Sequence, residues 1–250
     1  MGRTMRRWAA VAVLLAVLLG GCEGPDTTAA PLAEDTKPTG RGCGGATQRL
    51  ATSYRTKGRA LRGDVNGDGS ADRVTLRADR KRPRACRHVL VAELRPGITV
   101  AAPVKPLPWP GTSPHLLLLA EIDGRAGLEP IVTLSPAAVY RPGAVFTIHN
   151  GKLAQLRLEG ARPASLFPLY DEFPSGVDCA GDRGTIVATF GNVAEPDSHW
   201  DIKRSVYRAD GLRFELLRTE RSRVKVGPEA AQRWPEVGGD AFRSCPDRVD

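Results

Sequence analysis

Residues 63–76 have the sequence Gly63-Asp-Val-Asn-Gly-Asp-Gly-Ser-Ala-Asp-Arg-Val-Thr-Leu76. Gly, Asp and Asn in its first part favour tight turns, and its last four residues lead straight into a β-prone run. The stretch from Ala120 to Thr133 aligns with this segment without gaps. A third, fainter copy begins near Asp178, where Gly181 and Asp182 keep the register. The pattern predicts repeated units in which a polar turn leads into strands.

The rest of the domain has the same β-prone character. Short runs of β-branched and aromatic residues are separated by Gly, Pro and Asp, and Asn150-Gly151 and Asp210-Gly211 are typical hairpin turns. A helical pattern is visible at Pro228 to Trp234. We expect strands at Arg73–Arg77, His88–Leu94, Leu116–Glu121, Pro130–Leu134, Ala144–His149, Leu153–Glu159, Gly184–Phe190, Ile202–Arg208 and Leu212–Thr219.

These strands and turns predict an all-β fold. The repeats favour blade-like antiparallel sheets that form a small or incomplete β-propeller, and a β-sandwich is the alternative. A closed seven-bladed propeller is excluded because the domain is too short to contain seven four-stranded blades.

The first copy also has the composition of a calcium loop. Side-chain oxygens stand at its positions 1, 3, 5 and 9, and Gly69 stands at position 6, where the chain must turn sharply. An EF-hand is not expected, because its twelfth position, normally Glu, is Thr75 and a strand follows. The spacing predicts one structural Ca²⁺ held by Asp64, Asn66, Asp68, Asp72 and the backbone carbonyl of Ser70. A metal-free Asx-turn is the alternative.

Asp64 to Asp72, together with the strand Arg73 to Leu76, resembles the FG-GAP and VCBS-type repeats of secreted β-propellers. In that family, loops of the form Asp-x-Asn-x-Asp-Gly-x-x-Asp bind calcium, and the resemblance implies the same role for this loop. The second copy has Arg125 in place of the central carboxylate, and the third copy lacks the final ligand. We expect these two copies to be structural turns.

The N-terminus has the layout of an export signal. Arg3, Arg6 and Arg7 precede an apolar run from Trp8 to Leu19, which is short for a membrane span. It ends in Leu19-Gly20-Gly21-Cys22, which resembles the lipobox of bacterial lipoproteins. The resemblance implies that Cys22 carries a lipid and becomes the first residue of the mature chain. A plain signal peptide or a short uncleaved anchor is the alternative.

This interpretation divides the chain into a signal peptide (1–21), a lipidated flexible tether (22–42) and an all-β repeat domain (43–250). The tether contains Leu32 as its one large apolar side chain, so it cannot bury enough surface to fold. We therefore expect an extracytoplasmic protein that is anchored to the bacterial cell membrane by its lipid.

The cysteine count agrees with an extracytoplasmic location. If Cys22 is acylated, four cysteines remain for two disulfides, and three pairings are open. We favour Cys43 with Cys86 and Cys179 with Cys245, because each pair lies within one half of the chain. Zinc is the competing interpretation, but the chain has no Cys-x-x-Cys motif.

The charge distribution and the motifs limit the classes of function that are expected for this chain. The net charge is +8, but the basic residues are scattered among carboxylates, so no nucleic-acid partner is expected. The common catalytic motifs are absent from the sequence, and the richest polar clusters are Asp171-Glu172 and Asp197 to Asp201, with Trp109 as a loop aromatic. We expect a non-enzymatic protein that binds a protein or glycan partner or acts as a scaffold. An envelope hydrolase that acts on cell-wall or extracellular polymers is the alternative.

Overall fold

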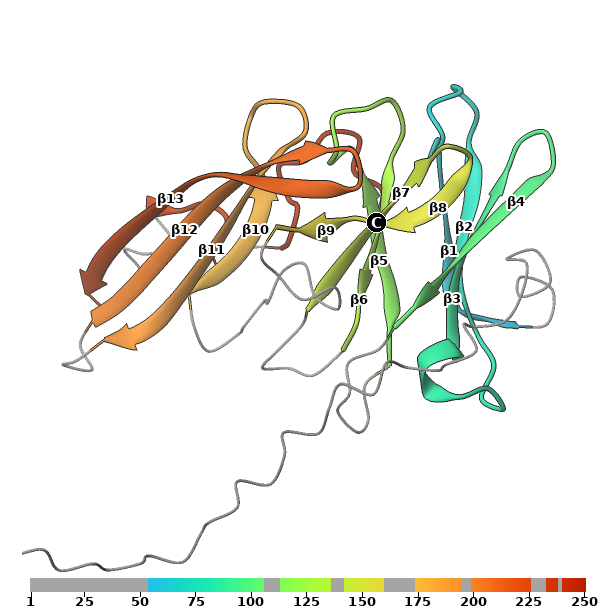
Figure 1. The fold of residues 1–250 in the computed structure, drawn as a ribbon, viewed down its shortest axis with the longest axis horizontal. Coiled ribbons are helices and arrows are strands. Elements are labelled where there is room, and N and C mark those ends of the chain that lie inside the picture. Colours follow the sequence, from blue (N-terminus) through green and yellow to red (C-terminus); the bar gives the residue numbers. More distant parts are fainter. Residues whose placement is uncertain are drawn as a thin grey trace, which may run out of the picture. The chain divides into compact units, whose positions relative to one another are not determined.

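The described part of the chain consists mostly of β-strands, which form three sheets (Figure 1). A computed structural model describes residues 54–105, 113–135, 142–159, 174–194, 199–225, 233–237 and 240–250. All of them belong to one compact unit, Arg41–Asp250. The predicted all-β fold class is confirmed. Among these residues, no helix has the length and apolarity that crossing a membrane requires.

In each sheet, strands that follow one another along the chain also lie side by side. The first sheet contains β1 (Arg55–Gly63), β2 (Asp72–Ala78), β3 (His88–Leu94) and β4 (Ile98–Val104), and a 3-10 turn, η1 (Arg84–Cys86), precedes β3. The second contains β5 (His115–Ala120), β6 (Glu129–Thr133), β7 (Gly143–His149) and β8 (Lys152–Gln155). The third contains β10 (Ser175–Cys179), β11 (Thr185–Ala194), β12 (His199–Asp210) and β13 (Arg213–Lys225), and β9 (Arg157–Leu158) lies beside β13. The pairing is antiparallel, as predicted, except that β9 runs parallel to β13.

Both predicted hairpin turns are present. Asn150 and Gly151 join β7 to β8 with φ angles of 51° and 69°, as a type I′ turn requires. The turn after β12 lies one residue later than predicted, because Asp210 pairs with Arg213. Its central residues are therefore Gly211, with a φ of 58°, and Leu212.

Two apolar cores hold the three sheets together. The first core includes Leu76, Leu90, Leu119 and Phe146, which come from the first and second sheets. The second core joins residues of the second and third sheets to the chain end, and includes Leu118, Ile131, Ile186, Phe214 and Phe242. The second sheet is thus buried on both faces, which explains why its strands have few polar residues.

Three strands were not predicted from the sequence. Strand β1 is mostly exposed and contributes only Leu61 as a fully buried side chain, so it lacks apolar alternation. Strand β4 contains Pro103, a residue that argues against a strand. Strand β10 is short and has polar residues, Ser175 and Asp178, at buried positions.

One predicted strand is divided in two. Residues 153–159 form β8 and β9, which belong to different sheets, and the buried Leu156 lies between them. No Gly or Pro interrupts residues 153–159, so the sequence contains no local signal of this crossing from the second sheet to the third. The predicted helix at Pro228 to Trp234 lies largely outside the described residues.

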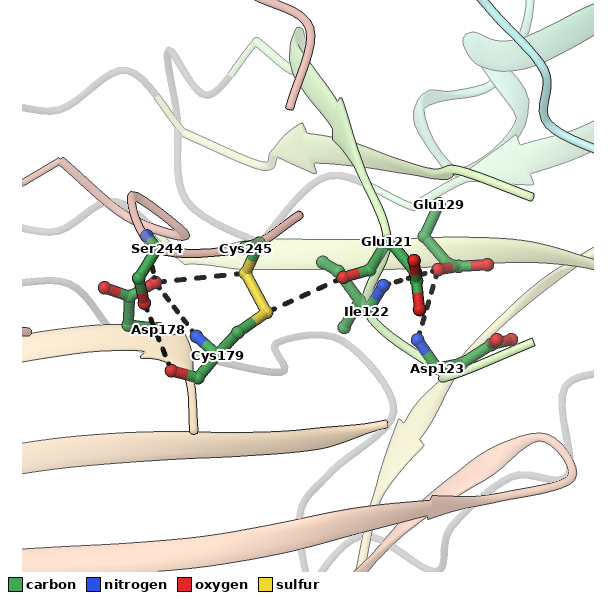
Figure 2. The surroundings of a disulfide bond; sticks show 8 residues. All are labelled: Glu121, Ile122, Asp123, Glu129, Asp178, Cys179, Ser244 and Cys245. Carbon is green, nitrogen blue, oxygen red and sulfur yellow. Dashed lines mark hydrogen bonds between the residues drawn. A yellow bond between two sulfur atoms is a disulfide. The ribbon is translucent and has the colours of Figure 1, made fainter. Parts of the chain in front are cut away.

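The end of the chain connects the second and third sheets. Leu119 in β5 exchanges backbone hydrogen bonds of 2.8 Å with Val249, and the Phe242 N–H donates to the Val177 carbonyl in β10 over 2.8 Å. A disulfide joins Cys179 to Cys245, with the two Cα atoms 4.9 Å apart (Figure 2). This is one of the two pairs that the sequence favours. Cys86 is also disulfide-bonded, and Cys43 lies outside the described residues.

Candidate metal centre

The three similar segments of the sequence lie at corresponding places in the three sheets. Each contributes a loop that leads from an edge strand to the next strand of its sheet. The first loop (64–71) joins β1 to β2, the second loop (121–128) joins β5 to β6, and the third loop (180–184) joins β10 to β11.

Neighbouring loops are in backbone contact, and together they are called the loop row here. The Leu128 N–H donates to the Asp64 carbonyl over 2.7 Å. A Cβ atom added to Gly67 would lie 2.5 Å from the carbonyl oxygen of Ala126, and one added to Gly124 would lie 2.8 Å from the backbone nitrogen of Gly184. Glycine is therefore required where the loops meet.

Asp64 organises the first loop. Its Oδ1 accepts hydrogen bonds from the Gly67 N–H at 2.7 Å and the Asp68 N–H at 3.2 Å, and its Oδ2 accepts one from the Gly69 N–H at 2.7 Å. Gly69 has a φ of 84°, in the left-handed region that glycine adopts without steric cost. The sharp turn expected at Gly69 is thus present.

Asn66, Asp68 and Ser70 form the exposed tip of the loop. The Asn66 amide donates to Asp68 Oδ2 over 2.8 Å, and the Ser70 N–H donates to Asp68 Oδ1 over 2.7 Å. The hydrogen bond from Asn66 is the main cause that lowers the pKa of Asp68, and the Ser70 N–H adds to it. The loop therefore favours the ionised form of Asp68, which is the form that binds a cation.

Asp72 lies at the buried end of the loop. Its side chain accepts hydrogen bonds from the Val65 N–H at 3.0 Å and the Arg95 N–H at 3.1 Å. It ties the loop to the turn after β3, and it is 1% exposed. The structure thus gathers Asp64, Asn66 and Asp68 in one loop and places Asp72 beneath them.

The donor set of the first loop fits a calcium ion in its chemistry. Three carboxylates and an amide oxygen are hard ligands, and Asp64 Oδ2 and Asp68 Oδ2 each accept one hydrogen bond and keep a second lone pair, whereas Asp64 Oδ1 already accepts two. The hydrogen bonds on Asp64 and Asp68 are also those of Asx-turns. Among the described residues, no group of three or more His, Cys, Asp or Glu side chains is arranged to hold a metal ion. Calcium in the first loop stays a prediction.

The second loop carries its own cation. Asp123 Oδ2 accepts a hydrogen bond from Arg125 Nε over 2.9 Å and another from Arg125 Nη2, and Nη2 also reaches Thr147 Oγ1 at 3.1 Å. The hydrogen bonds to Asp123 raise the pKa of Arg125. Arg125 Nη1 lies 2.9 Å from His149 Nδ1. The guanidinium thus supplies a positive charge to the buried carboxylate of Asp123.

Glu129 lies beneath this ion pair, in the position that Asp72 has in the first loop. Its Oε2 accepts hydrogen bonds from the Ile122 N–H at 2.7 Å and the Asp123 N–H at 3.1 Å (Figure 2). Burial, followed by the negative charge of Asp123, raises the pKa of Glu129 to about 8. Asp123 and Glu129 were expected to form only a turn. The structure places them in a buried acidic pair that depends on Arg125.

The third loop is fixed to the chain end. Asp178 Oδ1 accepts hydrogen bonds from the Cys179 N–H at 2.9 Å and the Ser244 N–H at 2.8 Å (Figure 2). Arg183 Nε lies 3.1 Å from Glu121 Oε1 in the second loop, in an ion pair without hydrogen-bond geometry. In this copy, a carboxylate holds backbone N–H groups, as expected for a structural turn.

The other polar clusters do not converge among the described residues. Asp171, Glu172, Asp197, Ser198 and Trp109 lie outside that part of the chain. Asp201 on β12 forms a cross-strand ion pair with Arg223 on β13, at 2.8 and 3.1 Å. This pair lowers the pKa of Asp201 and occupies its carboxylate.

The fold and the loop row define an all-β protein of three sheets that are joined by corresponding loops. Comparison of the chain with protein-family models, with curated proteins and with solved structures finds no match. The resemblances to FG-GAP and VCBS-type repeats and to bacterial lipoproteins rest on the sequence motifs.

Proposed function

We propose that this chain is a membrane-anchored extracytoplasmic lipoprotein whose all-β domain binds a protein or glycan partner or acts as a scaffold. The observation that carries the proposal is the loop row, in which a first loop with a calcium-type donor set is in backbone contact with the second loop, and the second with the third. Such a row fixes the relative positions of three sheets, as a binding surface requires. The motif at Leu19 to Cys22 supports the lipid anchor, and residues 23–42 supply the tether.

In this proposal, Asp64, Asn66, Asp68, Asp72 and the carbonyl of Ser70 hold one structural Ca²⁺. The ion supplies positive charge that offsets the repulsion among three carboxylates in one loop. The chain's own residues shape the site: the N–H groups of Gly67 and Gly69 orient Asp64, and Asn66 orients Asp68. The ionised loop then keeps its backbone contact with the second loop.

Calcium is expected to raise the melting temperature of the domain. At a concentration of about 100 times its dissociation constant, an ion that binds only the folded state adds about 2.7 kcal/mol, or roughly 5–10 °C for a domain of this size. Asp68→Ala should abolish the response, because it removes the central carboxylate. Differential scanning calorimetry in Ca²⁺ and in chelator measures both effects. Asp182→Ala, an exposed carboxylate of the third loop, is the matched control and should keep the response. Identical wild-type melting curves in Ca²⁺ and chelator would reject the site.

Binding by the mature domain is the second expected property. Purified residues 43–250 should bind isolated cell envelope saturably, whereas screens with ester, peptide and glycan substrates should show no turnover above background. The domain is used without its anchor so that membrane insertion does not contribute. Turnover that persists through purification and is lost in a His199→Ala variant would instead establish the hydrolase alternative. Absence of saturable binding would contradict the proposal.

A further inference from the structure

A groove lies where the three sheets meet, on residues whose sequence predicts strands and a turn but no binding role. It has a volume of about 730 Å³, within the range of small-molecule sites. Its walls come from β4, from β8 and β9, and from the hairpin between β12 and β13. Apolar residues line it together with charged ones, and among them Leu212 is 36% exposed whereas Leu153 is 6% exposed.

The charged residues of the groove are mainly cationic. Lys105, Arg157 and Arg213 line it, against a single carboxylate at Asp210. Lys105 and Arg157 are exposed, and within the described residues their side chains have no ion-pair or hydrogen-bond partner. Arg213 pairs with Glu215 at 3.4 Å, but both side chains are largely exposed, at 63% and 44%, so this pair contributes little. The groove thus has unneutralised positive charge.

The arrangement of these cations restricts the shape of the ligand. They lie on three separate segments, namely the residue after β4, β9 and the start of β13, so they line the groove from more than one sheet. An acidic peptide added as a strand would instead meet residues that alternate along one edge. A compact ligand with anions on more than one side, and with an apolar face for Leu212, fits this distribution better.

We propose that this groove binds the anionic sugar units of an envelope glycan, through their carboxylate or phosphate groups. The guanidinium of Arg157 can form two parallel hydrogen bonds with either anion, and Lys105 supplies a second positive charge. The sugar ring packs its apolar face against Leu212, which is 36% exposed. This inference rests on the proposed binding role and names the class of its ligand.

Isothermal titration calorimetry of the domain tests the inference with defined probes at constant ionic strength. The carboxylate probe is a galacturonate oligomer, the phosphate probe is a glycerol phosphate oligomer, and a neutral maltose oligomer of equal length is the control. We expect at least one charged probe to bind, and the neutral oligomer to bind at least about tenfold more weakly, because charge-assisted hydrogen bonds are lost. The charged probe that binds more tightly shows whether the groove recognises carboxylate or phosphate groups.

Matched double variants locate the binding. Lys105→Gln with Arg157→Gln should weaken binding of the preferred probe about tenfold or more. Arg59→Gln with Arg62→Gln makes a similar change of charge on exposed residues of β1 and should alter it less than about twofold. Equal losses in the two double variants, or equally tight binding of a poly-glutamate peptide, would overturn the inference. If the envelope binds but neither charged probe does, the inference about the groove is wrong and the proposed function stands. If a probe binds in the groove but the envelope does not, the proposed function fails alone.

Discussion

Arg125→Met should lower the free energy of unfolding by about 2–4 kcal/mol. The Asp123 side chain is 1% exposed, so its buried carboxylate would lose its cation, and Glu129 would lose the positive charge that lowers its pKa. We place the value at the lower part of the range for broken buried ion pairs because the Arg125 side chain is 42% exposed. Urea denaturation at pH 7.5 measures the change. Arg59→Met, at an exposed position of β1, is the control and should change stability by less than about 0.5 kcal/mol.

The pH dependence of the free energy of unfolding distinguishes the contribution of this charged cluster from that of apolar packing. Glu129 has a pKa of about 8 in the folded chain, against the usual 4.5 of a glutamate side chain. The unfolded chain thus releases this proton at lower pH, and the stability that Glu129 contributes is present below about pH 4.5 and is lost as pH rises through 8. The charge of Arg125 lowers the pKa of Glu129, so Arg125→Met should extend the loss to higher pH. His149, which contacts Arg125, and Asp123 are the other titratable groups beside it.

Glu129→Gln is the partner variant. An amide oxygen can still accept the N–H bonds of Ile122 and Asp123 without carrying charge, so we expect this variant to flatten the profile between pH 5 and pH 8 and to lessen the effect of Arg125→Met. If Arg125→Met costs the same at every pH, and Glu129→Gln leaves the profile unchanged, the titration of Glu129 is not coupled to the ion pair.

The fold class could be predicted because local signals and burial agree in most strands. The second sheet is apolar on both faces, and the Asn150-Gly151 turn has a conformation that its residues favour. Strands β1 and β10 were missed for the opposite reason. Their polar residues are held in place by neighbours distant in sequence, as when Asp178 accepts the Ser244 N–H, and no local pattern contains that information.

Prediction of the candidate sites from the sequence has the same limit, because residues distant in sequence come together there. The turn at Gly69 follows from the residues of one loop and could be predicted. The role of Arg125 depends on Thr147 and His149, which β7 brings to the second loop. The sequence did contain a signal for this role. The second copy has acidic residues at positions 1, 3 and 9, and at position 5 it has Arg125 where the first copy has a carboxylate. A cationic side chain therefore stands among the acidic residues of this loop. The groove cations come from three distant segments and have no common motif.

Loss of the disulfide between Cys179 and Cys245 is expected to have a comparably large effect. The bond closes a loop with a sequence separation of 66 residues, and the chain-entropy model gives about 4 kcal/mol for a loop of that length. A double variant, Cys179→Ser with Cys245→Ser, should therefore lower the free energy of unfolding by about 3–4 kcal/mol. Denaturation without reductant measures it, since reductant would also open the disulfide at Cys86.

The structure also predicts where this variant loosens first. The Leu119 N–H donates to the Val249 carbonyl at 2.8 Å, and the Glu121 N–H donates to the Pro246 carbonyl at 3.1 Å. Both bonds tie the chain end next to Cys245 to the second sheet. Hydrogen exchange at the backbone N–H groups of Leu119 and Glu121 should accelerate more than at that of Val91. Val91 lies in the first sheet, whereas the disulfide joins the third sheet to the chain end. Uniform acceleration of exchange would mean that the disulfide acts only on the unfolded chain. An unchanged free energy of unfolding would show that the chain end is held by its hydrogen bonds and by Phe242 alone.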